Sequence, residues 1–273
     1  MIVVYDEQMK NKKIERKCIF CLSENSSFSK EEHIIPESLG GDRILPKGFV
    51  CDQCNQYFGS NVEKNALALS PLAIARILMS IKSKRKRHAR LIGVRFEKNY
   101  KGMKFEAEGS DEADIIVRVN QDAYNDLKAN KIKTLYWSFE EGMPSLVRLL
   151  IKMGLEIIAT SKKLDVYDPV FDKARMAARN PKKSLVWKVA ETLLPLRSCW
   201  ESGVDDKGPY VRRTEYEYGV YRSPDHVIFF FQYWILVFII PLTEGGSFED
   251  GIDLINKDNL SVTPLNIRTV KLA

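Results

Sequence analysis

Four of the five cysteines fall into two pairs with the same internal spacing. Cys18 and Cys21 form the first CxxC pair, Cys51 and Cys54 form the second, and 29 residues separate the pairs. A CxxC turn brings two thiolates to one metal ion, and two such turns fill the tetrahedral shell of Zn²⁺. Because four thiolates leave no coordination position open, the predicted zinc ion is structural. Unrelated thiols or a redox CxxC are the alternatives.

Two further features favour zinc over disulfides. The first 17 residues are mostly polar and charged and lack the pattern of a secretory signal, so we expect a cytoplasmic protein whose thiols stay reduced. Cys199, next to Trp200, has no partner motif and is interpreted as a buried structural thiol. In a stretch of about 50 residues with few large apolar side chains, zinc binding would supply much of the folding free energy.

Between and after the cysteine pairs lie residues suited to phosphodiester hydrolysis. Glu32 and His33 are adjacent, and Asn55 directly follows the second pair. Carboxylate and amide oxygens are ligands for a hard divalent cation, which would neutralise the scissile phosphate and the leaving oxygen. A neutral imidazole would deprotonate the attacking water. Since side chains alternate along a strand, we expect Glu32 and His33 to point to opposite sides, one toward the metal and one toward the water.

The combined pattern CxxC–EHIIP–SLGG–CDQCN resembles the zinc-knuckle branch of the HNH endonucleases and the phage Holliday-junction resolving endonucleases of that class, over residues 16–64. The resemblance implies a ββα-metal fold with structural zinc on the four cysteines. It also implies that His33 is the general base and that Glu32 and Asn55 are the ligands of a catalytic Mg²⁺ or Mn²⁺ ion.

The sequence departs from this family in two places. No asparagine lies between His33 and Cys51, so the group that orients the His33 ring is open; a backbone carbonyl and Asp42 are the candidates. The acidic residue is Glu32, whereas the family more often has aspartate, and the longer side chain would shift the metal slightly.

Several polar residues have a plainer interpretation. Asn55 is also suited to cap a helix N-terminus, and His33 to cap a turn near the zinc. Glu63, eight residues after Asn55, could be a distant ligand, but we favour a solvated helix charge. His88 and His226 are expected to be solvated or packed rather than catalytic.

Most of the positive charge lies after the cysteine motifs. The net charge is +6, yet the residues through Lys64 contain nine basic and ten acidic side chains. A dense basic cluster follows, made of Lys82, Lys84, Arg85, Lys86, Arg87 and Arg90. It is either a solvated helix end or, as we favour, a surface that contacts the DNA backbone without reading sequence.

The fold class predicted is α+β, with an N-terminal ββα-metal HNH module carrying the four-cysteine zinc knuckle over residues 1–68 and a larger mixed α+β domain over residues 69–273. Apolar patterns predict strands at 1–5, 33–35, 91–96, 103–108 and 115–119, and further strands from Tyr210 to Leu242. They predict helices at 55–68, from Ser70-Pro71 to about residue 81, and at 144–161, 169–178 and 185–194.

The segment Val227–Leu242 is almost entirely apolar. It is shorter than the roughly 20 residues of a membrane span, is rich in β-branched and aromatic residues, and contains Gln232. We therefore interpret it as one or two buried strands and expect no membrane association.

The sequence thus predicts a metal-dependent DNA endonuclease that acts on double-stranded DNA, in anti-phage defence, restriction or a mobile element. We also expect a partner protein or a homodimer. Two alternatives remain open: a non-catalytic zinc-knuckle protein that binds nucleic acid or another protein, and a nuclease subunit that a partner activates.

Overall fold

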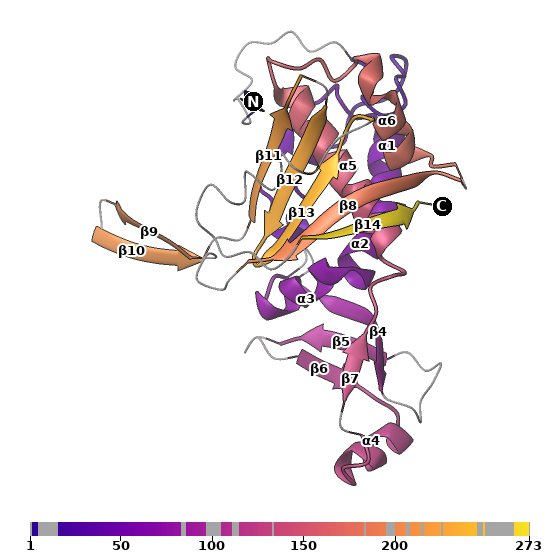
Figure 1. The fold of residues 1–273 in the computed structure, drawn as a ribbon, viewed down its shortest axis with the longest axis vertical. Helices are drawn as coiled ribbons and strands as arrows, with labels where there is room; N and C mark the ends of the chain where they lie inside the picture. Colours follow the sequence, from indigo (N-terminus) through magenta and orange to yellow (C-terminus); the bar gives the residue numbers. More distant parts are fainter. Residues whose placement is uncertain are drawn as a thin grey trace.

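The structure is a computed structural model of the chain (Figure 1). It describes residues 2–4, 16–82, 86–96, 105–110, 115–132, 134–182, 184–194, 200–205, 208–213, 216–224, 226–244, 248 and 265–272. Cys199 and two members of the basic cluster, Lys84 and Arg85, lie outside the described residues.

The cysteine-containing region has the ββα order that the sequence predicts. Its elements are β2 (Glu32–His33), η1 (Glu37–Leu39), β3 (Ile44–Leu45), α1 (Asp52–Tyr57), η2 (Phe58–Glu63) and α2 (Lys64–Leu69). β2 and β3 pair antiparallel. The segment η2 has π-helical geometry and joins α1 to α2 without a break.

An antiparallel sheet of six strands forms the largest layer. Its order is β1-β11-β12-β13-β8-β14. The strands are β1 (Ile2–Val4), β8 (Val186–Leu193), β11 (Tyr216–Arg222), β12 (Val227–Tyr233), β13 (Leu236–Pro241) and β14 (Asn266–Lys271). One face of this sheet is covered by α5 (Met143–Thr160), and α6 (Asp172–Arg179) follows after the turn η4 (Pro169–Phe171) (Figure 1).

A second, four-stranded sheet lies at the far end of the molecule, beyond α3 (Pro71–Leu78) (Figure 1). Its order is β6-β5-β4-β7. The elements are β4 (Arg90–Phe96), β5 (Phe105–Gly109), β6 (Ile115–Arg118), α4 (Gln121–Lys128) and β7 (Leu135–Trp137). The hairpin of β9 (Trp200–Asp205) and β10 (Gly208–Arg213) projects away from the large sheet (Figure 1).

Most of the predicted elements are present, and one is wrong. The expected helix over 144–161 is α5, the apolar segment 227–242 forms β12 and β13, and Ser70 caps α3 by accepting a hydrogen bond from the Leu72 amide. The expected helix over 185–194 is the strand β8. Trp187 and Val189 are buried while Val186 and Lys188 are exposed, and this period of two suits a strand that pairs with β13 on one side and β14 on the other.

The helix α5 is the centre of the apolar core. All but two of its residues are buried, and it packs against the large sheet on one side and against η2, α2 and α6 on others. Phe58 and Val62 of η2 belong to the same buried cluster as Ile151 and Leu155 of α5. The cysteine-containing region is therefore built onto α5 rather than attached by a linker. Among the described residues, no helix is long and apolar enough to cross a membrane.

Two glycines shape the turn between β2 and β3. Gly40 has a φ of 86°, in the left-handed region that favours glycine. A Cβ atom on Gly41 would lie 2.0 Å from the carbonyl oxygen of Ile35, which is a backbone atom that cannot move aside alone. The turn therefore needs glycine at position 41 so that the chain after His33 can fold back tightly.

We predict that Gly41→Ala lowers the free energy of unfolding by about 1–3 kcal/mol, the usual cost of forcing a methyl group into a packed site. Thermal unfolding followed by circular dichroism measures this change. Gly59→Ala is the control, because a Cβ atom at Gly59 meets nothing within 4 Å and alanine favours a helix. Equal unfolding midpoints for the wild type and Gly41→Ala would contradict the close packing at this turn.

Candidate functional site

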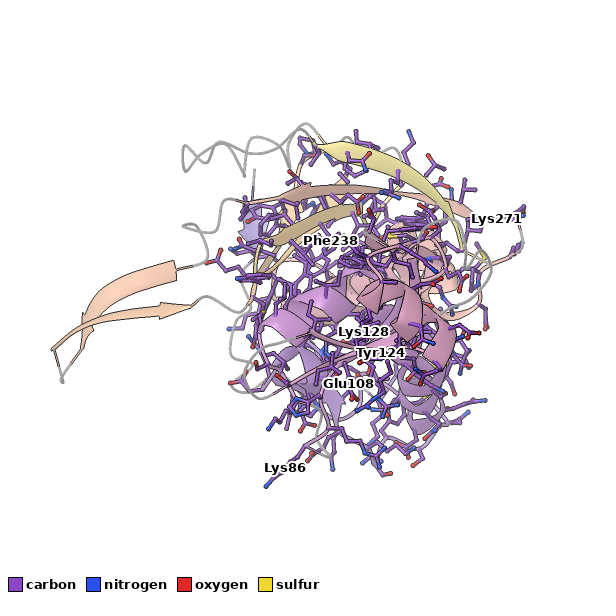
Figure 2. All side chains as sticks on the ribbon, turned by 90° about the horizontal axis from the view of Figure 1, so that it is seen from below. Lys86, Glu108, Tyr124, Lys128, Phe238 and Lys271 are labelled. Atoms are coloured by element: carbon purple, nitrogen blue, oxygen red, sulfur yellow. The ribbon has the colours of Figure 1, made fainter. Side chains whose placement is uncertain are left out.

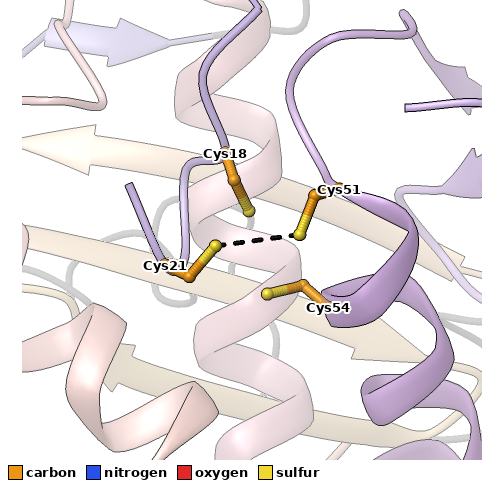
Figure 3. Close-up of side chains that lie close together, drawn as sticks. All are labelled: Cys18, Cys21, Cys51 and Cys54. Carbon is orange, nitrogen blue, oxygen red and sulfur yellow. Dashed lines mark hydrogen bonds between the residues drawn. The ribbon is translucent and has the colours of Figure 1, made fainter. Parts of the chain in front are cut away.

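The four paired cysteines converge at one point (Figure 3). Their Sγ atoms all lie within 4.8 Å of one another, and those of Cys21 and Cys51 are 3.7 Å apart. A tetrahedral ion with Zn–S bonds of about 2.3 Å places its sulfur ligands about 3.8 Å apart. All four cysteines are free thiols, so this set of donors fits one zinc ion.

Backbone hydrogen bonds hold the two CxxC segments together. The amide of Lys17 donates to the carbonyl of Gly48 at 3.2 Å, and the amide of Ile19 donates to the carbonyl of Phe49 at 2.8 Å. Cys51 is the N-cap of α1, and Cys54 lies in its first turn. These hydrogen bonds and the cysteine cluster therefore join the start of α1 to the first CxxC turn.

The thiols cannot all ionise without a cation among them. A hydrogen bond from the Cys54 side chain lowers the pKa of Cys18 to about 5. The same interaction with Cys18 raises the pKa of Cys54 far above its ordinary value, and burial raises the pKa of Cys21 to about 11. A bound Zn²⁺ would supply the positive charge that four neighbouring thiolates need.

A cleft of about 720 Å³ opens beside β2 and the helix α1-η2. The three residues predicted to act together, Glu32, His33 and Asn55, all line it. Its other lining residues are Glu31, Pro36, Glu37, Ser38, Gly59, Glu63, Lys64 and Arg87. The structure thus brings the predicted general base and both predicted cation ligands to one cavity.

Asp52 anchors the chain just before β2. Asp52 is the first residue of α1. Its carboxylate accepts hydrogen bonds from the amides of Ser29 and Lys30, at 2.8 and 2.9 Å, and from the Ser29 hydroxyl at 2.7 Å. Hydrogen bonds from Ser27 and Lys30 hold the pKa of Asp52 well below its usual range. Helix α1 thereby fixes the position at which Glu32 and His33 enter the cleft.

Asn55 lies within α1, not at its cap, because the helix begins at Asp52. The Asn55 Nδ2 donates to the carbonyl oxygen of Glu31 at 2.9 Å, which orients the amide and leaves Oδ1 on its opposite edge. His33 is partly exposed in the cleft. Asp42, one candidate to orient His33, instead accepts a hydrogen bond from the Tyr216 hydroxyl at 3.4 Å.

Glu32 is almost buried on the wall of the cleft and pairs with a lysine that the sequence did not single out. Its Oε1 lies 2.7 Å from the Nζ of Lys152, on α5. The same ammonium group lies 3.3 Å from Glu63 and 3.0 Å from Glu156. Lys152 and Glu156 are both fully buried, whereas Glu63 is 21% exposed.

Burial and charge pairing shift the pKa values of Glu32, Lys152 and Glu156 in opposite directions. Burial raises the pKa of Glu32 and of Glu156, and the Lys152 charge opposes that effect on both. Burial alone would lower the pKa of Lys152, but the charges of Glu156, Glu32 and Glu63 raise it well above its ordinary value. Lys152 is therefore charged at neutral pH and holds carboxylates of the cleft around it.

The expectation that Glu63 is a solvated helix charge is wrong. Glu63 ends the π-helical segment η2, lines the cleft and pairs with Lys152. Sequence reasoning also missed Lys152 and Glu156. The available signal was that these two charges, four residues apart, lie on one face of a mostly apolar helix, where isolated charges are rarely buried without partners.

The described members of the basic cluster follow α3, which ends at Leu78, and so do not lie on a helix end; Arg90 is the first residue of β4. The four described members, Lys82, Lys86, Arg87 and Arg90, are exposed. Lys86 points outward at the edge of the molecule (Figure 2). Arg87 lines the cleft, so one cluster member shares the cavity with Glu32, His33 and Asn55, while Arg90 pairs with Glu106 at 3.7 Å.

Neither His88 nor His226 lines the cleft. The Nδ1 of His226 lies 3.0 Å from the hydroxyl of Ser223, in the turn between β11 and β12.

Comparison with known families matches residues 18–68 to the HNH endonuclease family. The match covers the four cysteines, β2, β3, α1 and η2, and ends within α2 at residue 68. No curated protein and no solved structure matches the chain. The chain therefore carries an N-terminal HNH module with a four-cysteine cluster, followed by a larger sheet-rich region.

We predict that Cys51→Ser reduces bound zinc from about one ion per chain to almost none and destabilises the HNH module, because three thiolates leave the tetrahedral shell incomplete. Inductively coupled plasma mass spectrometry measures the zinc, and thermal unfolding measures the stability. Cys199→Ser, outside the two pairs, should keep its full zinc content. Full zinc in Cys51→Ser would contradict the assignment.

Proposed function

We propose that the protein is a metal-dependent endonuclease that hydrolyses phosphodiester bonds of double-stranded DNA. The observation that supports this most directly is that Glu32, His33 and Asn55 line one cleft within the HNH module. Restriction or anti-phage defence in the cytoplasm is the setting that we propose. The zinc cluster serves as scaffold, because its four thiolates leave no position for substrate.

The donors in the cleft fit a hard cation such as Mg²⁺ or Mn²⁺. Glu32 and the Asn55 amide offer oxygen ligands, and Glu31, Glu37 and Glu63 add negative charge to the same cavity. Mg²⁺ keeps several of its waters and is often held by only one or two carboxylates of the protein. When bound, such a cation supplies charge neutralisation for the scissile phosphate and the leaving oxygen.

The residues of the chain supply the remaining parts of the reaction. The His33 imidazole, partly exposed in the cleft, accepts a proton from the attacking water. Lys64 and Arg87 on the rim bring positive charge to phosphates that enter an otherwise acidic cavity. The hydrogen bond from Asn55 to the Glu31 carbonyl holds α1 against the start of β2, and so keeps the base and the cation ligands together.

We predict that the purified protein converts supercoiled plasmid to nicked or linear DNA when Mg²⁺ or Mn²⁺ is present, and that His33→Ala slows cleavage about 10²–10⁴-fold, the usual contribution of a positioned general base. Gel electrophoresis over time measures the rates, with EDTA as the metal-free control.

His226→Ala is the matched control, since His226 lies outside the cleft and should cleave at the wild-type rate. Undiminished cleavage by His33→Ala would contradict the mechanism. A zinc-loaded wild-type protein that binds DNA but does not cleave it with either metal would contradict the proposed activity and favour a non-catalytic zinc knuckle.

The exposed, described members of the basic cluster support a role in binding the DNA backbone. We predict that Arg87→Ala weakens binding to DNA of any sequence and reduces the slope of log K against log salt by about 1, because one phosphate contact is lost. Fluorescence anisotropy with labelled duplex DNA at several salt concentrations measures both quantities.

Lys128→Ala is the control, because this residue lies on α4, beyond the four-stranded sheet (Figure 1). A salt slope for Arg87→Ala equal to that of the wild type would remove Arg87 from the DNA-contacting surface.

A further inference from the structure

The Lys152 ammonium group makes its contacts with two different parts of the chain. Glu32 and Glu63 come from the HNH module, and Glu156 comes from α5 itself, one turn beyond Lys152. The same Nζ donates to the carbonyl oxygen of His33 at 3.4 Å. Lys152 therefore touches the backbone of the proposed general base and the side chain of the proposed cation ligand next to it.

Lys152 is held rigidly enough to position these groups. It lies in the middle of the 18-residue helix α5, its side chain has no exposed surface, and Glu156 fixes its Nζ at 3.0 Å. A carboxylate has two oxygens, and Lys152 contacts Oε1 of Glu32. Because Glu32 also lines the cleft, its second oxygen is the one that remains for a cation there.

We propose that Lys152 is a positioning residue for the divalent cation, and that it acts by holding Glu32 and Glu63 on the wall of the cleft. The proposal rests on the proposed function, since it assigns a role to a residue toward the cation of that site. Lys152 lies outside residues 18–68, which match the HNH family. The larger region of the chain would then supply a residue that positions the cation ligands, in addition to packing against the HNH module.

A purely structural role for Lys152 makes a different prediction. If the ammonium group only docks the module onto α5, its removal lowers stability and leaves the cation affinity of the folded protein unchanged. If it positions Glu32, the affinity falls, because groups that orient a metal ligand typically contribute about 10–100-fold to metal binding. Cation affinity, measured apart from cleavage, separates the two roles.

The variant for this test is the double substitution Lys152→Met with Glu156→Leu. Lys152→Met alone leaves three carboxylates around an empty position and is expected to unfold. The double variant removes both members of the buried pair, so neither Lys152 nor Glu156 is left without its partner. Replacing a buried ion pair by apolar residues of similar volume is often tolerated. Loss of positioning is then the main change at the cleft.

The experiment titrates the zinc-loaded, full-length protein with Mn²⁺ and follows free Mn²⁺ by its electron paramagnetic resonance signal. We expect the Kd for Mn²⁺ to rise about 10–100-fold in the double variant, with zinc content and unfolding temperature kept near the wild-type values. The control is Lys173→Met with Glu244→Leu, which removes an exposed ion pair outside the cleft and should leave the Kd unchanged.

An unchanged Mn²⁺ affinity in the double variant would overturn the positioning role, even where the wild type cleaves DNA. If the double variant is unfolded, Lys152→Leu with Glu156→Gln is titrated in its place, since it also removes the donor at position 152; a Kd equal to that of the wild type would again overturn the proposal. Wild-type protein that binds Mn²⁺ but does not cleave DNA contradicts the proposed function alone. A weakened affinity in the double variant would then still support the positioning role.

Discussion

The ammonium group of Lys152 is buried where the HNH module meets α5, and burial of an unpaired charge costs several kcal/mol. That cost is offset only when carboxylates approach from the module, because Glu156 alone leaves further donor positions unused. The helix α5, the module and the large sheet must therefore be docked together before the group is satisfied. This constraint links the cleft to the core, since the same helix packs against the sheet.

Two separate sets of interactions hold the two walls of the cleft in place. The cysteine cluster and Asp52 hold the start of α1, which carries Asn55. Lys152 holds Glu32 on β2, at the other wall. Because one set holds α1 and the other holds β2, the distance between Asn55 and Glu32, the predicted cation ligands, depends on both. The acidic lining would repel a DNA phosphate unless a cation is bound, which is consistent with a reaction that depends on metal.

The sequence predicted the site where its parts are close together in the chain. Fixed spacing within 16–64 was enough to bring the cysteines, Glu32, His33 and Asn55 together, because short turns leave few alternatives. The role of Lys152 could not be assigned, since Glu32 and Glu63 lie about 90 to 120 residues away in the sequence and only the packing of α5 brings them to it. The strand β8 was predicted as a helix because the spacing of its apolar residues fits both a helix and a strand. The strands that pair with it, β13 and β14, are distant in sequence.

In the proposed reaction, His33 takes a proton from water during cleavage of DNA. Chemical rescue tests it most directly: His33→Ala is assayed on plasmid DNA with Mn²⁺ while imidazole is added to the buffer, with Glu32→Ala treated in the same way. Free imidazole can enter the space left by the ring and act as the base. If His33 is the base, imidazole restores cleavage by His33→Ala in proportion to the unprotonated imidazole concentration and leaves Glu32→Ala unrescued. Equal stimulation of both variants by imidazole would contradict this role of His33.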